Sequence, residues 1–423
     1  MVKLKEYKIY TENSPIERLP QPQRVYIPLS QHLGNVTSPI VQVGNQISIG
    51  QKIASSDAPV TSPIHASISG KVTAIQNWPH PSLGICKAIV IENDGKGTLA
   101  TTTFPSPEKI ERLTTNEIRT IVREAGIVGM GGAGFPTHIK LTPPKPVDTL
   151  IINGVECEPY LTSDYRLMVE KPSEILKGVE LIVRCLGIKQ VYIAIEDNKP
   201  EAIDVFKNKI QGTNYKVQIL KSLYPQGGEK QLIKNILKKE VPSGKLPFDI
   251  GVLVHNVATV FAIYEAVYKN KPLHERAVTV TGDFLTHPKN LMVPIGTPVK
   301  ELIEFCKPQR KAARIIVGGP MMGIAQYTEM VPIIKTSGGV ILLSDEQVQP
   351  YIEDNCIHCG ECVRNCPVGL QPCLISLAVE RNNWELAKGY SPLDCIECGL
   401  CAYLCPAKRN LIQSIKYAKL KTK

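Results

Sequence analysis

The sequence predicts a multidomain chain of mixed α/β and α+β class, in which four domains follow a short N-terminal arm. Three observations lead to this prediction. The chain has 423 residues, which is too long for one ordinary hydrophobic core. Strand-like and helix-like segments alternate through its middle part. Nine of its 13 cysteines lie between Cys356 and Cys405, so they belong to one C-terminal module.

The first 100 residues are rich in short β-strand patterns. Residues 1–28 are expected to form an irregular arm, and residues 29–100 a β domain. The segments IVQVGNQISIGQKIA and ISGKVTAIQ resemble the two halves of a lipoyl-type barrel-sandwich hybrid domain. A lipoyl carrier needs a modifiable lysine at the hairpin tip between these halves, and residues 53–70 contain none. We therefore expect a structural or docking role for this domain.

Residues 105–270 are expected to form an α/β domain around a largely parallel sheet. The segments TLIING (149–154) and QVYIAIE (190–196) have the composition of buried strands. Amphipathic helical patterns follow them at 172–187 and 199–210. Strands that alternate with helices of this length are typical of βαβ units, so a Rossmann-like fold is predicted.

Residues 271–343 return to short strands. AVTVTGD, ARIIVGGP and GGVILL are separated by glycine turns and by one helical segment, VKELIEFC. This pattern indicates a small α+β domain of the β-grasp (SLBB) type. Residues 344–423 form the cysteine module.

Composition narrows the function classes. The formal net charge is +10, but the lysines are spread along helices and the tail without an aromatic stacking motif. We therefore expect docking to acidic proteins and no nucleic-acid binding. No stretch approaches the roughly 18 apolar residues of a membrane span, and the N-terminus lacks the apolar core of a secretory signal. The sequence predicts a cytoplasmic protein that reaches a membrane only through partner subunits.

Two cysteine motifs have identical spacing. They are CIHCGECVRNCP (356–367) and CIECGLCAYLCP (395–406). The spacing Cys-x2-Cys-x2-Cys-x3-Cys-Pro is that of two-cluster ferredoxins, in which the fourth cysteine ligates the other cluster. Two 4Fe–4S clusters are therefore predicted. The expected ligands are Cys356, Cys359, Cys362 and Cys405 for the first cluster, and Cys395, Cys398, Cys401 and Cys366 for the second.

Zinc is the alternative ligand of paired CxxC motifs. Structural zinc sites rarely use four cysteines in one compact run, and no further His or Cys pair follows the motifs here. The segment SLAVERNNWELAKG between the motifs is helical in character, which favours a helical dicluster ferredoxin domain. Cys373 lies outside both motifs and is expected to be a buried structural cysteine.

A glycine-rich segment, GMGGAGFPTHIK (129–140), precedes the first buried strand of the α/β domain. Glycines let a phosphate approach the backbone closely. The segment has neither the Gly-Lys-Ser/Thr of a P-loop nor a clean GxGxxG after a strand. By itself it is equally compatible with a cofactor loop and with a structural turn.

Three further segments, NGVECEP (153–159), YPQGGEKQL (224–232) and VHNVATV (254–260), follow the glycine segment in order. Together the four segments resemble the FMN-binding region of the flavoprotein subunit of respiratory complex I. The resemblance implies a non-covalently bound FMN and no catalytic acid–base residue. It implies FMN contacts from Gly129, Gly131, Gly132, Gly134, Lys140, Asn153, Glu156, Tyr224, Gly227, Glu229 and Asn256.

Four residues depart from the pattern of that family: Met130, Val155, Gly228 and His255. Val155 and Gly228 stand where the family has acidic residues. These departures concern the nicotinamide contacts more than the flavin contacts, so binding of NADH stays an open question at this point.

The order of the four domains resembles the RnfC family, whose members belong to an ion-translocating electron-transport complex, over nearly the full length. This resemblance implies electron transfer between NAD(H), FMN and two 4Fe–4S clusters, as in a ferredoxin:NAD oxidoreductase. It implies ferredoxin-type and membrane subunits as partners. Two alternatives remain: an electron-transfer partner of proline reductase (PrdC type), and a non-enzymatic iron–sulfur relay that does not bind NADH.

Overall fold

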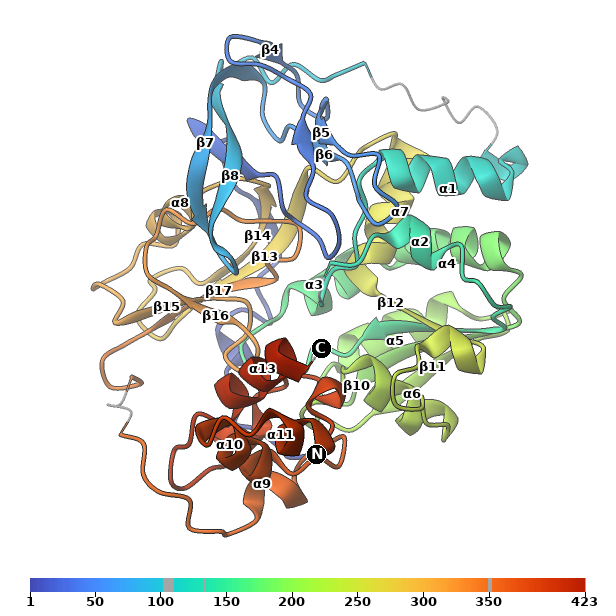
Figure 1. The fold of residues 1–423 in the computed structure, drawn as a ribbon. Helices are drawn as coiled ribbons and strands as arrows, with labels where there is room; N and C mark the ends of the chain where they lie inside the picture. The colour runs from blue at the N-terminus through green and yellow to red at the C-terminus, as the bar shows by residue number, and fades with distance from the viewer. Residues whose placement is uncertain (102–109, 133, 349–351, 423) are drawn as a thin grey trace.

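The structure, a computed structural model, describes residues 1–101, 110–132, 134–348 and 352–422. The barrel-sandwich domain lies at one end of the molecule and the cysteine module at the opposite end (Figure 1). The α/β and β-grasp domains lie side by side between them (Figure 1). No helix within the described residues is both long and apolar enough to span a bilayer.

The barrel-sandwich domain consists of two small sheets, with strand orders β2-β8-β7-β4 and β3-β5-β6. All of their strand pairs are antiparallel. Inward-facing side chains such as Ile27, Ile53 and Ile89 form a single core between the sheets. The strands are β2 (Arg24–Pro28), β3 (Ser38–Pro39), β4 (Gln46–Ile47), β5 (Lys52–Ser55), β6 (Ile64–His65), β7 (Gly70–His80) and β8 (Gly84–Asn93).

The N-terminal arm is more regular than expected. It contains the short helix η1 (Lys8–Tyr10) and the strand β1 (Ile16–Arg18), and the whole of β2 also falls within residues 1–28. β1 pairs in parallel with β14 (Lys289–Pro294), and β2 pairs with β8. The expectation of an irregular arm fails here because the partner strands lie far along the chain, where a local pattern cannot show them.

The α/β domain has a four-stranded parallel sheet with the order β11-β10-β9-β12. Its strands are β9 (Thr149–Gly154), β10 (Gln190–Glu196), β11 (Tyr215–Leu220) and β12 (Val252–Asn256). The short elements of the domain are η2 (Ile110–Arg112), α2 (Thr137–Lys140) and η3 (Pro247–Ile250). The longer helices are α1 (Thr115–Glu124), α3 (Ser163–Glu170), α4 (Pro172–Leu186), α5 (Pro200–Lys209), α6 (Glu229–Leu237) and α7 (Val257–Lys269).

Helices cover both faces of this sheet because its strands are apolar on both sides. Along β9, Leu150 and Ile152 join the core formed with α4 and α7, whereas Ile151 joins the core formed with α6. α4 begins at Pro172, where the missing N–H costs nothing, and ends at Gly187 in the left-handed region. Gly178 lets α4 approach α7, since a Cβ there would lie 2.3 Å from the carbonyl oxygen of Val260.

The β-grasp domain has a six-stranded mixed sheet with the order β1-β14-β13-β17-β15-β16. The helix α8 (Val299–Phe305) packs on it through Val299 and Leu302, which share a core with Val278 and Leu291. The remaining strands are β13 (Glu275–Thr281), β15 (Arg314–Val317), β16 (Ile324–Gln326) and β17 (Gly339–Leu343).

The C-terminal module is helical, as the segment between the cysteine motifs predicted. Its core joins α10 to α13 through Ile375, Ala378, Leu411 and Ile415. The elements are α9 (Glu361–Arg364), α10 (Pro372–Glu380), α11 (Trp384–Gly389), η4 (Pro392–Asp394), α12 (Leu400–Tyr403) and α13 (Leu411–Thr422).

Candidate functional site

The cysteine module is an internal duplication with an offset of 39 positions, from Cys356 to Cys395. α9 and α12 occupy the same offset, and α10 and α13 begin at it. The backbone repeats as well: His358 and Glu397 both have positive φ, and Gly360 and Gly399 follow them with φ of 76° and 78°. Each motif therefore winds its first three cysteines through the same left-handed turns.

Two cavities in this module collect the motif cysteines in crossed sets. The first has a volume of about 80 Å³ and is lined by Cys356, Cys359, Cys362 and Cys405, together with Cys373. The second, of about 10 Å³, is lined by Cys366, Cys395, Cys398 and Cys401. The structure thus brings together the two sets of four that the sequence predicted, with the fourth cysteine of each motif at the other motif's cavity.

Backbone amides already point at several of these sulfurs. The N–H of Leu370 donates to Sγ of Cys366 at 3.3 Å, and the equivalent N–H of Arg409 donates to Sγ of Cys405 at 3.4 Å. A third such bond joins the N–H of Glu397 to Sγ of Cys395 at 3.3 Å. Such donors favour thiolates, so the two cavities suit iron–sulfur clusters, whose potentials depend on hydrogen bonds to sulfur.

Several of the predicted FMN residues, among them Asn153 and Asn256, lie at the carboxyl end of the parallel sheet. From β9 the chain proceeds outward through β10 to β11 and then returns to the other side of β9 as β12. This reversal creates a switch point between β9 and β12, where open α/β sheets bind ligands. Asn153 and Asn256 are register partners at that point. Two separate motifs of the sequence therefore meet across one pair of strands.

The glycine loop lies against this switch point. A Cβ on Gly131 would lie 2.8 Å from Nδ2 of Asn256, and Gly131 has a φ of +78°. Gly131 and Gly132 are exposed, whereas Gly134 is buried and Gly129 half-buried. The N–H of Met130 donates to Oγ1 of Thr259 on α7. The loop thus presents an exposed glycine backbone beside Asn256, as a phosphate-bearing ligand requires.

Lys140 is held at the same end of the sheet. Its Nζ donates to Oε1 of Glu229 and to the carbonyl oxygen of Val254, each at 2.9 Å. Its side chain is 27% exposed, so Lys140 is not sealed off from solvent. The neighbouring His255 is buried, and burial together with the charge of Lys140 lowers its pKa to about 3. His255 is therefore neutral at physiological pH.

Asn153 and Gly227 join two further predicted segments. Nδ2 of Asn153 donates to the carbonyl oxygen of Gly227 at 2.9 Å, and its Oδ1 accepts from the N–H of Val155. A Cβ on Gly227 would lie 2.7 Å from the carbonyl oxygen of Val155, so glycine is needed for this close approach. The amide of Asn153 is thus fixed in orientation by the protein itself.

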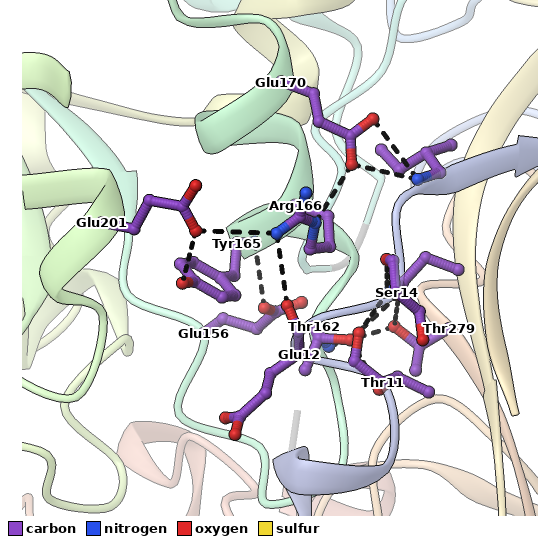
Figure 2. Close-up of polar contacts among 12 residues, drawn as sticks. Thr11, Glu12, Ser14, Glu156, Thr162, Tyr165, Arg166, Glu170, Glu201 and Thr279 are labelled. Carbon is purple, nitrogen blue, oxygen red and sulfur yellow. Dashed lines mark hydrogen bonds and ion pairs between the residues drawn. The ribbon is translucent and has the colours of Figure 1, made fainter.

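Glu156 has its carboxylate turned to the N-terminus of α3. It accepts from the N–H groups of Asp164 and Tyr165 and from the hydroxyl of Ser163. Figure 2 shows this carboxylate near Thr162 and Tyr165 and beside the N-terminal arm. The arrangement satisfies helix amides that would otherwise lack acceptors. The structure therefore gives Glu156 a positioning contact within the loop that follows β9.

Asp164 is a residue of this site that the sequence reasoning missed. Asp164 is half-buried, and Nδ2 of Asn256 donates to its Oδ2 at 2.6 Å. Desolvation, with the nearby carboxylate of Glu156, raises the pKa of Asp164 to about 7. The sequence signal that could have indicated it is its position: Asp164 follows Ser163, the first residue of α3, and lies eight residues after Glu156. Through this bond Asp164 fixes the orientation of the Asn256 amide.

The arm fastens the loop that follows β9. Nζ of Lys8 donates to the carbonyl oxygens of Glu156, Glu158 and Leu161 at 2.8, 2.8 and 2.6 Å. Thr11 and Thr162 share a hydroxyl hydrogen bond of 2.7 Å, which is drawn in Figure 2. The sequence contains no local signal for these contacts, which span about 150 residues of chain.

Tyr224 faces the cysteine module. It is buried, and its hydroxyl donates to the carbonyl oxygen of Cys398 at 2.6 Å. Cys157 packs in the same small cluster, together with Leu400 and Met321. Glu158, two residues beyond Glu156, accepts from the N–H groups of Met321 and Met322. The segments that carry the predicted flavin contacts therefore also touch the second cysteine cavity.

Comparison with known proteins identifies each domain. Family models match in the order in which the sequence predicted the domains. They are the RnfC barrel sandwich hybrid domain at residues 2–96, the Nuo51 FMN-binding domain at 122–265, the SLBB domain at 277–325 and the 4Fe-4S dicluster domain at 355–409. These matches confirm the predicted fold class, and they confirm FMN and 4Fe–4S clusters as the cofactors to which the domains are suited.

Relatives extend over almost the whole chain. The C component of the proton-translocating ferredoxin:NAD(+) oxidoreductase complex of Clostridium ljungdahlii is 48% identical over 97% of this chain and 91% of its own length. The C component of the Na(+)-translocating complex of Acetobacterium woodii is 42% identical over 94% and 91%. The chain belongs to the RnfC family. The resemblance of its domain order to that family is confirmed.

RnfC relatives also include the C component of the ion-translocating oxidoreductase complex of Rhodobacter capsulatus, 41% identical over 98% of this chain and 80% of its own length. Among solved structures, an NAD+-reducing NiFe-hydrogenase in its H2-reduced state superposes with a TM-score of 0.52. The match covers 76% of this chain and 64% of the hydrogenase chain at 18% identity. At this identity the likeness shows a shared fold only.

Proposed function

We propose that this RnfC chain passes electrons between NAD(H) and one-electron carriers, as the peripheral subunit of a ferredoxin:NAD oxidoreductase complex. Bound FMN would supply the exchange between two-electron and one-electron chemistry, which nicotinamide and iron–sulfur clusters cannot perform on each other directly. The chain's own residues bind and orient the cofactors, and none needs to act as a catalytic acid or base.

For FMN we propose the switch point between β9 and β12 as the site. The exposed glycines 131 and 132 and the ammonium of Lys140 would receive the phosphate, because they supply backbone amides and positive charge. The oriented amides of Asn153 and Asn256 would face the flavin ring and ribityl chain. Glu156 would act through its contact with α3, and Gly129, Gly134, Gly227 and Glu229 would shape the walls.

For the clusters we propose the two cavities. Cys356, Cys359, Cys362 and Cys405 would hold the first 4Fe–4S cluster. Cys366, Cys395, Cys398 and Cys401 would hold the second. Burial raises the pKa of Cys398 to about 11, so cluster assembly must displace a proton from that thiol.

The observation that carries the proposal is the hydrogen bond from Tyr224 to Cys398. It joins a segment with flavin-site residues, Gly227 and Glu229, to a loop with cluster ligands, over a sequence distance of 174 residues. Electron transfer requires closely spaced cofactors, and this contact sets the second cysteine cavity directly beside the flavin domain.

NADH oxidation tests the proposal. Purified chain loaded with FMN should lose its flavin absorbance when NADH is added without oxygen, and should then reduce an artificial one-electron acceptor. A spectrum that NADH leaves unchanged, with FMN still bound, would refute the NADH step. NADPH serves as the comparison nucleotide, and chain freed of FMN serves as the control.

A relay that does not bind NADH is the second candidate. The replacement of acidic residues by Val155 and Gly228 favours it, because the family resemblance places acidic side chains there. The same titration separates the two functions: a relay would accept electrons from a reduced carrier such as ferredoxin and show no response to NADH.

We also propose a place at the cytoplasmic side of the membrane, through ferredoxin-type and membrane subunits of the complex. The relatives carry the names of ion-translocating complexes. Cell fractionation tests this: the chain should sediment with membranes when the other subunits are present and should be released by salt.

A further inference from the structure

The barrel-sandwich domain packs against the flavin domain with the region that a carrier domain would keep exposed. Residues 61–70, within the hairpin region where a lipoyl carrier has its modified lysine, are all buried. Figure 1 shows β5 and β6 beside the α/β domain, on the side of α1 and α2. An ion pair between Lys52 on β5 and Glu124 on α1 joins the two domains there. A swinging carrier needs an exposed tip, so the burial of this region indicates a structural role.

Lys335 connects three domains at this contact. It precedes β17 in the β-grasp domain, and its side chain is 0% exposed. Its Nζ donates to the carbonyl oxygen of Pro63 in the barrel-sandwich domain and to that of Gly126 in the α/β domain, each at 2.6 Å. Its backbone N–H donates to Oε1 of Gln31 at 3.1 Å. Burial lowers the pKa of Lys335 to about 7, and its amine can donate two hydrogen bonds in either protonation state.

Gly126 begins the stem of the glycine loop, which consists of residues 126–129 and 135–137. The N–H of Gly129 donates to the carbonyl oxygen of Phe135 at 2.8 Å and thereby joins the two halves of the stem. Gly126 is buried, whereas the glycines proposed to receive the phosphate lie beyond the stem and are exposed. The position of the stem therefore determines where the exposed backbone of the loop lies relative to the sheet.

Glycine is required at both points where neighbouring domains touch this segment. Gly126 has a φ of +69°, and a Cβ on it would lie 2.4 Å from the carbonyl oxygen of Pro63. Gly134 has a φ of +72°, and a Cβ on it would lie 2.8 Å from Cγ2 of Thr336, the residue after Lys335. One short segment of the β-grasp domain thus contacts the glycine loop on both of its sides.

We propose that Lys335 is a positioning residue for FMN: by fastening Gly126 to the barrel-sandwich domain, it holds the glycine loop in the arrangement that receives the phosphate. The inference rests on the proposed function, because it requires FMN at the switch point. It also gives the barrel-sandwich domain a part in the flavin site, since the carbonyl of Pro63 is the second acceptor of the same amine.

The effect on binding should depend on the phosphate. The apparent affinity for a ligand falls in proportion to the fraction of chains whose site is in the competent arrangement. Removing the amine of Lys335 frees the stem to move relative to the sheet, so the contacts of the loop with the phosphate weaken. The amides of Asn153 and Asn256 have partners of their own in the α/β domain, and their contacts with the rest of the flavin should persist.

The test compares FMN with riboflavin, which lacks the phosphate. The full chain is purified with its clusters, freed of FMN and titrated with each flavin, and binding is followed by flavin fluorescence. Lys335→Met keeps most of the side-chain volume and removes the donor. Its Kd for FMN should rise roughly tenfold or more, and its Kd for riboflavin by about twofold or less. Without flavin, the amide of Gly129 should exchange faster with solvent than in the wild type.

Ser67→Ala is the matched control. The hydroxyl of Ser67 donates to the carbonyl oxygen of Ile295, so this variant loses another buried contact between the barrel-sandwich and β-grasp domains. The contact does not involve the glycine loop. Ser67→Ala should therefore lower the unfolding midpoint and leave the ratio of the two flavin affinities unchanged.

The outcomes separate this inference from the proposed function. Wild type that does not bind FMN would overturn both. Wild type that binds FMN, with Lys335→Met weakening FMN and riboflavin equally or weakening FMN no more than Ser67→Ala does, would overturn the inference alone. If Lys335→Met does not fold, Gly126→Ala decides from the other side of the contact, because an unchanged ratio of the two affinities there would refute the role of this contact.

Discussion

Lys8 offers the sharpest test of how the arm supports the flavin site. The side chain is buried, and its ammonium donates three hydrogen bonds to carbonyl oxygens of the loop that follows β9. The carbonyl of Glu158 also accepts from the N–H of Leu161. Among the described residues, the carbonyls of Glu156 and Leu161 accept from Lys8. Replacement of Lys8 by Met preserves most of the volume of the side chain and removes its donors.

The magnitude follows from these contacts. Each hydrogen bond from a charged group contributes about 1.5–3 kcal/mol, so three contribute roughly 4–9 kcal/mol. Burying the ammonium costs several kcal/mol, which Lys8→Met avoids. We expect a net loss of about 2–4 kcal/mol in the local stability of this loop. Because about 1.4 kcal/mol corresponds to a tenfold change, amide exchange there should accelerate roughly 30- to 1000-fold.

Hydrogen exchange followed by mass spectrometry measures this directly. The N–H groups of Asp164 and Tyr165, which Glu156 holds, should lose protection, and FMN should bind more weakly. Lys3→Met is the matched control, because Lys3 is exposed and should change neither property. Less than a twofold change in exchange at Asp164 and Tyr165 in Lys8→Met would refute the reasoning.

Three further predictions concern the glycine loop, Asp164 and the clusters. Gly131→Ala should lower the free energy of unfolding by about 1–2 kcal/mol, because φ is +78° and the new Cβ would meet Asn256. At Gly132 a new Cβ would have no contact within 4 Å, so Gly132→Ala should leave the unfolding midpoint of the FMN-free chain unchanged. Desolvation raises the pKa of Asp164 to about 7 in the folded chain, whereas in the unfolded chain it is about 4. Between these two pH values the folded chain keeps a proton that the unfolded chain has released, so the free energy of unfolding falls as pH rises through this window. In Asp164→Asn the free energy of unfolding, measured with urea, should fall less between pH 5 and pH 8 than in the wild type. A fall equal to that of the wild type would contradict the raised pKa of Asp164. Cys359→Ala should halve the iron content and leave FMN binding intact; loss of both cofactors would argue against separate sites.

Motif spacing carried most of the prediction for the cysteine module. Within one motif the distance between side chains is set by a few covalent links, so the spacing already limits which sulfurs can converge. The parallel sheet was equally accessible, because TLIING and QVYIAIE coincide with β9 and β10. The FMN residues were named from resemblance, and the sheet topology supplied the reason why Asn153 and Asn256 come together.

Contacts between distant segments were decided by tertiary structure. The sequence by itself determined the domain order, the strands of the parallel sheet and the two cysteine sets, since these depend on local patterns. It could not show that Lys8 reaches the loop after β9, that Tyr224 bonds to Cys398, or that Cys373 enters the first cavity. Those contacts depend on how whole elements pack against one another. A contact between side chains of two domains produces no repeating pattern in the sequence from which it could be predicted.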